Sequence, residues 1–281
     1  MDYEDLDPHS QRIHDLSAMG EDHVSKETIR KARHAYYGNV SYFDDWLGKI
    51  VKTLEQTNLR DNTIIIVISD HGDMLGERGL WYKMSFFEWS SRIPMIISAP
   101  DRFSAQRINN NVSLLDLLPT LVDLAKPAGG DAPEFADHID GRSLVRLMRG
   151  EDVADSDEVI GEMLCEGAKS PCMMIRRGRY KYIHSDPDPV QLYDLESDPN
   201  ELNNLSGNKE LEDLERRFAD EINSRWDSQA LRKEVILDQK RRRKVFESLS
   251  KGGHTPWDHN YSRDASKQYM RNHLDLNDLE R

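Results

Sequence analysis

The sequence predicts an α/β protein made of part of a layered sheet domain (1–150), a small antiparallel α+β subdomain (151–229), and a helix with an extended arm (230–281). Residues 63–69 and 93–98 support the first part, because short apolar runs rich in β-branched residues are typical of buried strands. Turn residues between short strand-like segments support the second. The polar, aromatic tail has little periodicity, which predicts an arm that lies on another surface.

The first long helix is expected after Ser25, which can cap it. Residues 1–24 lack apolar periodicity and are predicted to form a loop. After Ser25, apolar residues recur in steps of three and four, which predicts that one helix face packs against a core. These residues are Ala32, Tyr36, Val40, Phe43, Leu47, Ile50 and Leu54.

The two apolar runs are predicted to be strands, and a further helix is expected to start at Ser113 and Asp116. Leucines at 114, 117, 118, 121 and 124 should form its buried stripe. A helix–strand–helix order implies parallel pairing in a layered sheet. Both strands have the composition of central strands, which need a neighbour on each side. We therefore expect the remaining strands to come from outside this chain.

The second region has a different pattern. Gly178 separates two strand-like segments, which predicts a hairpin in a small antiparallel sheet. Residues 192–195 are expected to add an edge strand, and residues 208–249 keep helical spacing. The strand-like segments of the sheet are 159–164, 172–177 and 179–184.

Composition excludes several classes of protein. A formal net charge of −13, with acids and bases interspersed, argues against nucleic acid as a partner. No apolar run approaches the ~20 residues of a membrane span, so no membrane partner is expected. The acidic first residues do not resemble a signal peptide. Cys165 and Cys172 are too few for a disulfide framework and are expected to be free thiols in a cytoplasmic protein.

The segment after the first strand carries the chemistry. Asp70 and His71 can offer a carboxylate oxygen and an imidazole nitrogen to a metal, and Lys83 can bind an anion. Ligands bind beyond the carboxyl ends of strands in open α/β sheets. The spacing therefore predicts a metal-assisted site for a charged ester.

The same residues carry a family resemblance. Ser69-Asp70-His71-Gly72-Asp73-Met74-Leu75-Gly76-Glu77-Arg78-Gly79, with Lys83, resembles a conserved block of the sulfatases, in the alkaline-phosphatase-like superfamily. Asp7-Pro8-His9-Ser10 and the block from Leu192 to Pro199 extend the resemblance. Tyr269-Met270-Arg271-Asn272-His273 resembles the tail of choline-sulfatases. The resemblance implies an alkaline-phosphatase-like layered sheet.

The resemblance also implies roles for individual residues. Asp70 and His71 would bind one divalent cation, with Ca²⁺ expected because it prefers oxygen ligands. Imidazole favours softer ions, which leaves Mn²⁺ open, and Mg²⁺ also remains possible. Lys83 would hold a sulfate oxygen, so Lys83 and His71 are the candidate catalytic residues and Lys83 a substrate-binding residue. Asp7 and His9 are expected to pack the loop, with direct substrate contact as the alternative.

The family nucleophile is a formylglycine made from the first residue of a Cys-x-Pro-x-Arg motif or its serine form. Neither cysteine of this chain begins such a motif, and the patterns at Ser185 and Ser197 lack the arginine. The chain thus resembles the C-terminal portion of a sulfatase. We expect the nucleophile to come from outside it, and the chain alone to be inactive or poorly soluble.

The implied reaction is hydrolysis of a small sulfate ester, choline sulfate, to choline and sulfate. A quaternary ammonium needs aromatic faces and a carboxylate, and the tail offers Trp257, Tyr261, Tyr269 and Asp275. Asp275 is the candidate substrate-binding carboxylate, or else it only anchors the arm. The arm is expected to join subunits of a homo-oligomer. Two alternatives stay open: a phosphonate or phosphate monoester hydrolase, and a non-catalytic remnant or assembly module.

Overall fold

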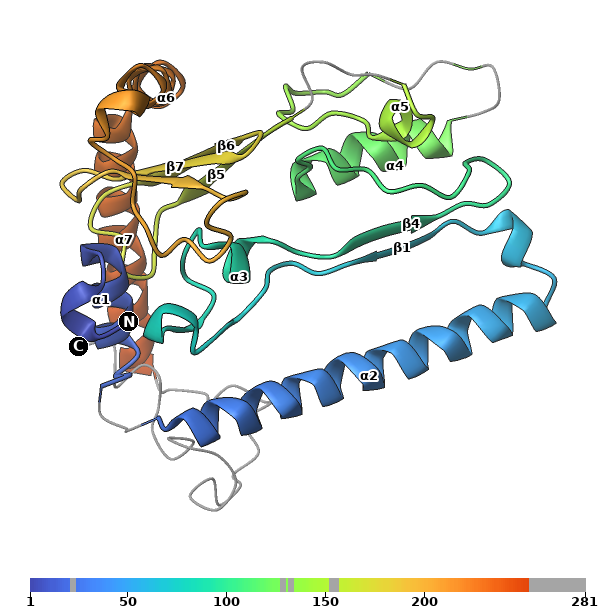
Figure 1. Ribbon diagram of the computed structural model, residues 1–281, viewed down its shortest axis with the longest axis horizontal. Coiled ribbons are helices and arrows are strands. Elements are labelled where there is room, and N and C mark those ends of the chain that lie inside the picture. The colour runs from blue at the N-terminus through green and yellow to red at the C-terminus, as the bar shows by residue number, and fades with distance from the viewer. Residues whose placement is uncertain (21–23, 127–129, 131–133, 152–156, 253–281) are drawn as a thin grey trace.

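The computed structural model describes residues 1–20, 24–126, 130, 134–151 and 157–252, in which helices alternate with three antiparallel sheets (Figure 1). This mixture agrees with the α/β class. The helices are α1 (Pro8–Leu16), α2 (Lys26–Gln56), α3 (Glu88–Ser91), α4 (Leu117–Ala125), α5 (Val145–Met148), α6 (Glu212–Arg225) and α7 (Ser228–Leu249). The strands are β1 (Ile65–Ile68), β2 (Met74–Leu75), β3 (Trp81–Tyr82), β4 (Met95–Ser98), β5 (Glu158–Met163), β6 (Cys172–Arg177), β7 (Tyr180–His184) and β8 (Gln191–Asp194).

The two predicted strands of the first region exist but run antiparallel. Ile65 pairs with Ser98 and Ile68 with Met95. The expectation of parallel pairing is therefore wrong. A parallel pair needs a crossover that returns the chain to the starting edge, whereas here the segment with β2, β3 and α3 lies beyond the end of β1 and the chain re-enters from that end as β4. Within the described residues this sheet has two strands only, so the neighbours expected for central strands are not among them.

Helix α2 begins where the sequence predicts, because the Ser25 hydroxyl accepts a hydrogen bond from the Thr28 amide at 3.1 Å. Its apolar face, however, is open. No residue of α2 is buried, and Val40, Phe43 and Ile50 of this face are 52%, 54% and 54% exposed. The expected packing of this face against a core is therefore not formed within the described residues. Figure 1 shows α2 running alongside β1 and β4, on the side away from α4.

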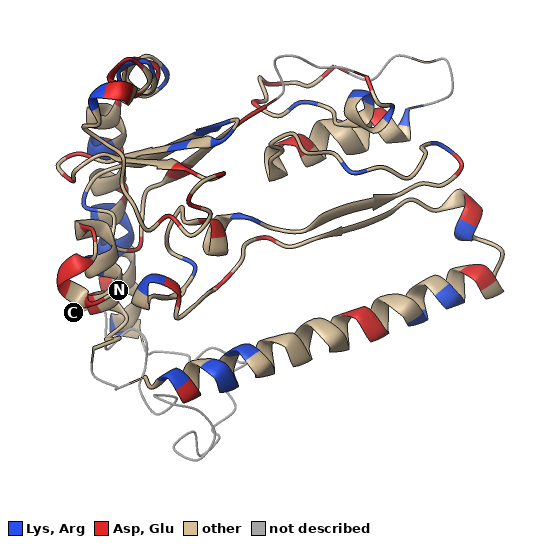
Figure 2. Ribbon diagram, viewed as in Figure 1, with Lys and Arg blue, Asp and Glu red and all other residues tan. Residues whose placement is uncertain are grey.

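Helix α4 shows the same contrast between a correct start and an open face. Ser113 and Asp116 form a capping box, as the sequence predicts. Of the predicted buried leucines only Leu124 is buried, while Leu118 is 52% exposed. Figure 2 shows that the β1–β4 ribbon between α2 and α4 carries few charges along its strands. None of the described helices combines the length and apolar character that a membrane span requires.

The N-terminal residues, expected to form a loop, contain α1. The Asp7 carboxylate accepts a hydrogen bond from the Ser10 amide at 3.1 Å, and Pro8 occupies the first helical position. Such a cap followed by proline is a helix-start pattern. The helix was missed because nine residues are too few to establish an apolar periodicity. Ile13 anchors it at 1% exposure.

Strands β5, β6, β7 and β8 form one antiparallel sheet in that order. The predicted hairpin is confirmed, and its turn uses Gly178 with φ +54°, a conformation that glycine adopts without strain. The expected edge strand is β8. The helical stretch predicted for 208–249 divides into α6 and α7. Helix α6 covers one face of the sheet, where the core comprises Met173, Ile175, Tyr182, Leu192, Phe218 and Ile222.

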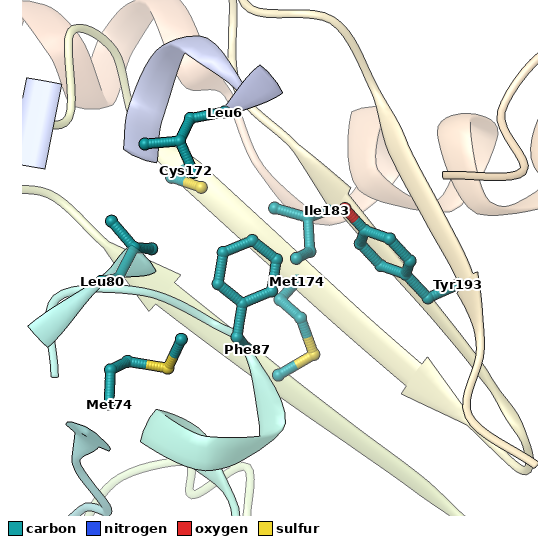
Figure 3. Packing of buried hydrophobic residues seen from close by; sticks show 8 residues of the cluster. All are labelled: Leu6, Met74, Leu80, Phe87, Cys172, Met174, Ile183 and Tyr193. Atoms are coloured by element: carbon teal, nitrogen blue, oxygen red, sulfur yellow. The ribbon is translucent and has the colours of Figure 1, made fainter. Parts of the chain in front are cut away.

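The opposite face of this sheet packs on the segment that follows β1. Side chains of successive strand residues alternate between faces, so Cys172 and Met174 of β6 point away from α6. Figure 3 shows the resulting cluster, which also explains why Cys172 is a buried free thiol, whereas Cys165 is exposed. Its members are Leu6, Met74, Leu80, Phe87, Cys172, Met174, Ile183 and Tyr193. The antiparallel sheet therefore supports the candidate site from behind.

Two phenylalanines allow a matched test of this architecture. Phe218 on α6 is 1% exposed and Phe246 on α7 is 63% exposed. We expect Phe218→Ala to lower the free energy of unfolding by about 3–5 kcal/mol through loss of burial and the cavity left behind. Phe246→Ala should change it by less than about 0.5 kcal/mol. Urea unfolding of both variants measures the difference, and equal effects would contradict the assignment of α6 to the core.

The pair of Arg179 and Asp194 predicts a pH dependence of stability. Hydrogen bonds from Arg179 lower the pKa of Asp194 from 3.8 to about 2. A lowered folded-state pKa stabilises the protein above the unfolded value, and the gain is lost as the pH falls through the folded value. Asp194→Asn should therefore reduce stability at pH 7, and its difference from wild type should shrink between pH 4 and 2. Asp213→Asn, at an exposed ion pair, is the control.

Candidate active site

The candidate site lies in the segment that links β1 to α3. Strands β2 and β3 pair, with Met74 opposite Tyr82 and Leu75 opposite Trp81. This short hairpin folds the chain back on itself, so that Lys83 returns to His71. The Lys83 Nζ lies 2.7 Å from His71 Nε2. Two of the residues singled out by the sequence are thus brought into contact across twelve positions.

Asp70 and His71 present their side chains together. The His71 Nδ1 lies 2.8 Å from the Gly72 carbonyl oxygen. A carbonyl oxygen only accepts, so Nδ1 carries the proton and Nε2 keeps a lone pair. The Lys83 ammonium donates to that lone pair, and Asp70 Oδ2 lies 3.3 Å from the same nitrogen. Carboxylate, imidazole and ammonium therefore converge at one point.

The pKa of the Asp70 carboxyl lies below its ordinary value. Backbone N–H groups at Asp70 and His71 donate to the carboxylate, and the positive charge of Lys83 adds to the effect. The side chain is 82% exposed, so it remains open to a ligand from solvent. Asp70 is thus an accessible, ionised carboxylate.

Helix α3 holds both ends of this arrangement. The Gly72 amide donates to the Ser90 carbonyl oxygen at 2.7 Å. A Cβ at Gly72 would lie 2.2 Å from the Trp89 carbonyl oxygen, so only glycine permits this close approach. On its other side, the Ser90 hydroxyl contacts the carbonyl oxygens of Lys83 and Ser85. Ser90 is not among the residues predicted from the sequence, because nothing in the sequence around Ser90 indicates that it contacts both Gly72 and Lys83.

The N-terminal block packs against the same segment. His9 is 7% exposed, and its Nε2 donates to the Met84 carbonyl oxygen at 3.1 Å. Asp7 caps α1 and lies 3.7 Å from Arg78. Both residues therefore take the packing role expected of them, His9 at Met84 next to Lys83 and Asp7 at Arg78.

The donor set fits part of a metal site. Asp70 Oδ2 and His71 Nε2, 3.3 Å apart, are close enough to bind one cation at the usual ~2.0–2.6 Å. The part of the chain that the structure describes holds no group of three potential His, Cys, Asp or Glu ligands. Asp275, and the tail aromatics Trp257, Tyr261 and Tyr269, lie outside the described residues.

A third serine pattern does contain the arginine: Ser98-Ala99-Pro100-Asp101-Arg102 fits Ser-x-Pro-x-Arg. Its position excludes it from this site. Ser98 pairs with Ile65, at the end of β1 remote from Asp70, and its hydroxyl accepts a hydrogen bond from Arg60 at 2.7 Å. Arg102 donates to the Leu124 carbonyl oxygen. Ser98 is therefore not the nucleophile facing Asp70.

Comparison with known proteins covers nearly the whole chain. Residues 6–127 match the family described as Sulfatase, residues 76–228 the N-sulphoglucosamine sulphohydrolase C-terminal family, and residues 233–281 the family described as choline sulfatase enzyme C terminal. A choline-sulfatase of Rhizobium meliloti (strain 1021) is 41% identical over 280 residues, which are 99% of this chain and 54% of that protein.

Solved structures agree with these matches. The phosphonate monoester hydrolase of Agrobacterium radiobacter superposes with a TM-score of 0.62 at 28% identity, over 75% of this chain and 43% of that one. A 2-O GAG sulfatase, BT1596, gives 0.66 at 26% identity, over 79% and 49%. The chain thus spans about half the length of the choline-sulfatase it matches. The chain belongs to the sulfatase family, and its residues 233–281 are of the choline-sulfatase C-terminal type.

Proposed function

We propose that this chain is part of a sulfuric ester hydrolase that cleaves choline sulfate to choline and sulfate. The observation that carries the proposal is the convergence of Asp70, His71 and Lys83 at the end of β1. This arrangement combines a cation-binding pair with a fixed ammonium. The likeness to a choline-sulfatase supports the choice of substrate.

Lys83 is proposed to bind a sulfate oxygen. Negative charge shifts to the oxygens of a sulfate ester as its bond to the leaving group breaks, and a positioned cation stabilises that charge without further reorganisation. The Lys83 backbone is held by Ser90 and its Nζ by His71. The contact with Ser90 sets the backbone position of Lys83 before the substrate arrives. Its Nζ must leave the lone pair of His71 before a cation binds there.

A divalent cation would be held by Asp70 Oδ2 and His71 Nε2, with further ligands from outside the described residues. When bound, it would supply Lewis-acid polarisation of a sulfate oxygen. The Nδ1–H bond from His71 to the Gly72 carbonyl keeps Nε2 available as a ligand. We expect Ca²⁺, with Mn²⁺ and Mg²⁺ as the alternatives to be compared.

The nucleophile is proposed to come from a further segment of polypeptide, as a formylglycine. The open apolar faces of α2 and α4 support this, because such surfaces are normally covered. The direct test is the coding sequence upstream of Met1, where an in-frame Cys-x-Pro-x-Arg or Ser-x-Pro-x-Arg is expected. A long upstream sequence with neither motif would favour a non-catalytic assembly role, in which this chain folds alone without hydrolase activity.

The C-terminal arm is proposed to contribute to choline binding and to a homo-oligomer. Asp275 would face the quaternary ammonium, in a segment matching the choline-sulfatase C terminus. We also propose the three-part division at 151 and 230. The second of these boundaries lies next to the start of α7 at Ser228.

A phosphonate or phosphate monoester hydrolase is the alternative activity, favoured by the likeness to the Agrobacterium radiobacter enzyme. The complete enzyme should be assayed with choline sulfate, a phosphate monoester and a phosphonate monoester. A higher kcat/KM for choline sulfate supports the proposal. A higher value for either phosphorus ester would replace it with the alternative.

Substitution of Lys83 tests its proposed contact with the sulfate group. Lys83→Ala should lower kcat/KM for choline sulfate in the complete enzyme by about 10²–10³, the usual loss when one donor to developing negative charge is removed. Lys31→Ala removes an exposed lysine of α2 that pairs only with Glu27 among the described residues, and should leave turnover unchanged. Equal rates for Lys83→Ala and wild type would remove Lys83 from the site.

Removal of the cation tests the proposed metal site. Chelation should abolish turnover, and re-addition of Ca²⁺, Mn²⁺ or Mg²⁺ separately identifies the ion that restores it. Asp70→Ala should weaken binding of that ion, measured by calorimetry, because one of two identified ligands is lost. Asp61→Ala, at an exposed carboxylate outside the site, is the control. Unchanged affinity in Asp70→Ala would disprove the ligand assignment.

A further inference from the structure

A buried charged network lies directly behind the candidate site. Lys181 of β7 is 0% exposed, although lysine is rarely buried without a partner. Its Nζ lies 2.7 Å from the Phe86 carbonyl oxygen, 2.8 Å from Glu201 Oε1 and 2.6 Å from Glu88 Oε1. An ammonium group has three donors. All three are used, two by the segment of Phe86 and Glu88 and one by Glu201.

Glu201 is the second buried member, also 0% exposed. Its Oε1 accepts from Lys181, and its Oε2 accepts from the backbone amide of Glu88 at 2.6 Å. Its backbone carbonyl accepts from Arg78. The Glu201 backbone has φ +55°, a left-handed conformation that is uncommon for residues other than glycine. Both carboxylate oxygens and the main chain of Glu201 are therefore engaged.

The sulfatase-like block from Leu192 to Pro199 explains how Glu201 reaches this position. The Asp198 amide donates to the Asp194 carbonyl oxygen at 2.8 Å, and the Glu201 amide donates to the Asp198 carbonyl oxygen at 3.1 Å. These successive turns lead the chain from edge strand β8 to Glu201, whose carboxylate contacts Lys181. The block thus delivers a carboxylate to the network, a role that its sequence did not reveal.

Glu88 connects the network to the site, because it is the first residue of α3. Its Oε1 pairs with Lys181 and its Oε2 with Arg176 Nη1 at 2.8 Å. Lys181 and Arg176 are directly opposite each other on neighbouring strands. The first turn of α3 is therefore fastened to the sheet by two cations, while Ser90 in the same helix holds Gly72 and Lys83.

We propose that Lys181, Glu201 and Glu88 are positioning residues, which fix α3 and thereby set the mutual placement of His71 and Lys83. The antiparallel subdomain acts on the site through this helix without touching the substrate. This inference rests on the proposed function, in which Lys83 and His71 act on the sulfate group.

Adjacent arginines of β6 provide a matched test. Arg176 pairs with Glu88 at α3, whereas Arg177 points to the opposite face and pairs with Glu158 and Glu221. In the complete enzyme, Arg176→Met should raise hydrogen–deuterium exchange at residues 70–72 and 83–85 by about tenfold, which equals ~1.4 kcal/mol of lost local stability. Arg177→Met should leave exchange in these segments at the wild-type rate.

Turnover of choline sulfate provides the second measurement. Misplacement of catalytic groups by about 1 Å costs up to ~10²-fold, so kcat per folded molecule should fall by about 10- to 100-fold in Arg176→Met. Arg176→Lys keeps a charged donor for Glu88 and should restore both exchange and kcat. A merely structural defect would not show this rescue together with localised exchange.

Glu201→Gln gives an independent variant, because one of the two accepting oxygens becomes an amide NH₂, which cannot accept from Lys181 or from the Glu88 amide. It should loosen the same two segments. Wild-type exchange at residues 70–72 and 83–85 in Arg176→Met and Glu201→Gln would overturn the inference, and so would an equal effect of Arg177→Met. Exchange requires no activity, so it remains decisive for the anchoring of α3 even if Lys83→Ala shows that the proposed function is wrong.

Discussion

The ammonium group of Lys181 is buried between the antiparallel sheet and α3. The arrangement of the candidate site depends on the groups that pair with this ammonium. A buried charge costs several kcal/mol unless partners satisfy it. Glu88, Glu201 and the Phe86 carbonyl supply those partners. They come from two segments far apart in sequence, and both must stay close to the sheet. Burial also raises the pKa of Glu201, which reflects how little water reaches this network.

The two parts of the chain differ in how completely they bury their own apolar surface. The β5–β8 sheet is covered on one face by α6 and on the other by the segment that carries the site. One face of the β1–β4 ribbon packs against α4 and α5 through Met95 and Ile97. Its other face, where Ile96 is 60% exposed, and the apolar face of α2 lack such cover within the described residues. Apolar surfaces of this extent usually contact another polypeptide. This agrees with a chain that spans about half the length of its choline-sulfatase relative.

Local interactions explain which elements the sequence predicted well. The β6–β7 hairpin follows from Gly178, and the starts of α2 and α4 follow from Ser25 and from Ser113 with Asp116, because turns and caps involve residues close in sequence. The direction of β4 relative to β1 could not be inferred, since it depends on where the intervening 26 residues lead the chain. Helix α1 was not predicted because it is too short to show an apolar periodicity, although Asp7 and Pro8 mark its start.

Sequence alone identified the chemical groups of the candidate site: the carboxylate of Asp70, the imidazole of His71 and the ammonium of Lys83, in a block of the sulfatase type. These identities follow from a contiguous motif, so no fold was needed to find them. Only the tertiary structure decided how they are held. Ser90, Glu88, Lys181 and Glu201 act across as many as 113 positions, and contacts at such separations leave no local pattern. The same geometry removed Ser98 from the site, because an antiparallel strand places it at the far end.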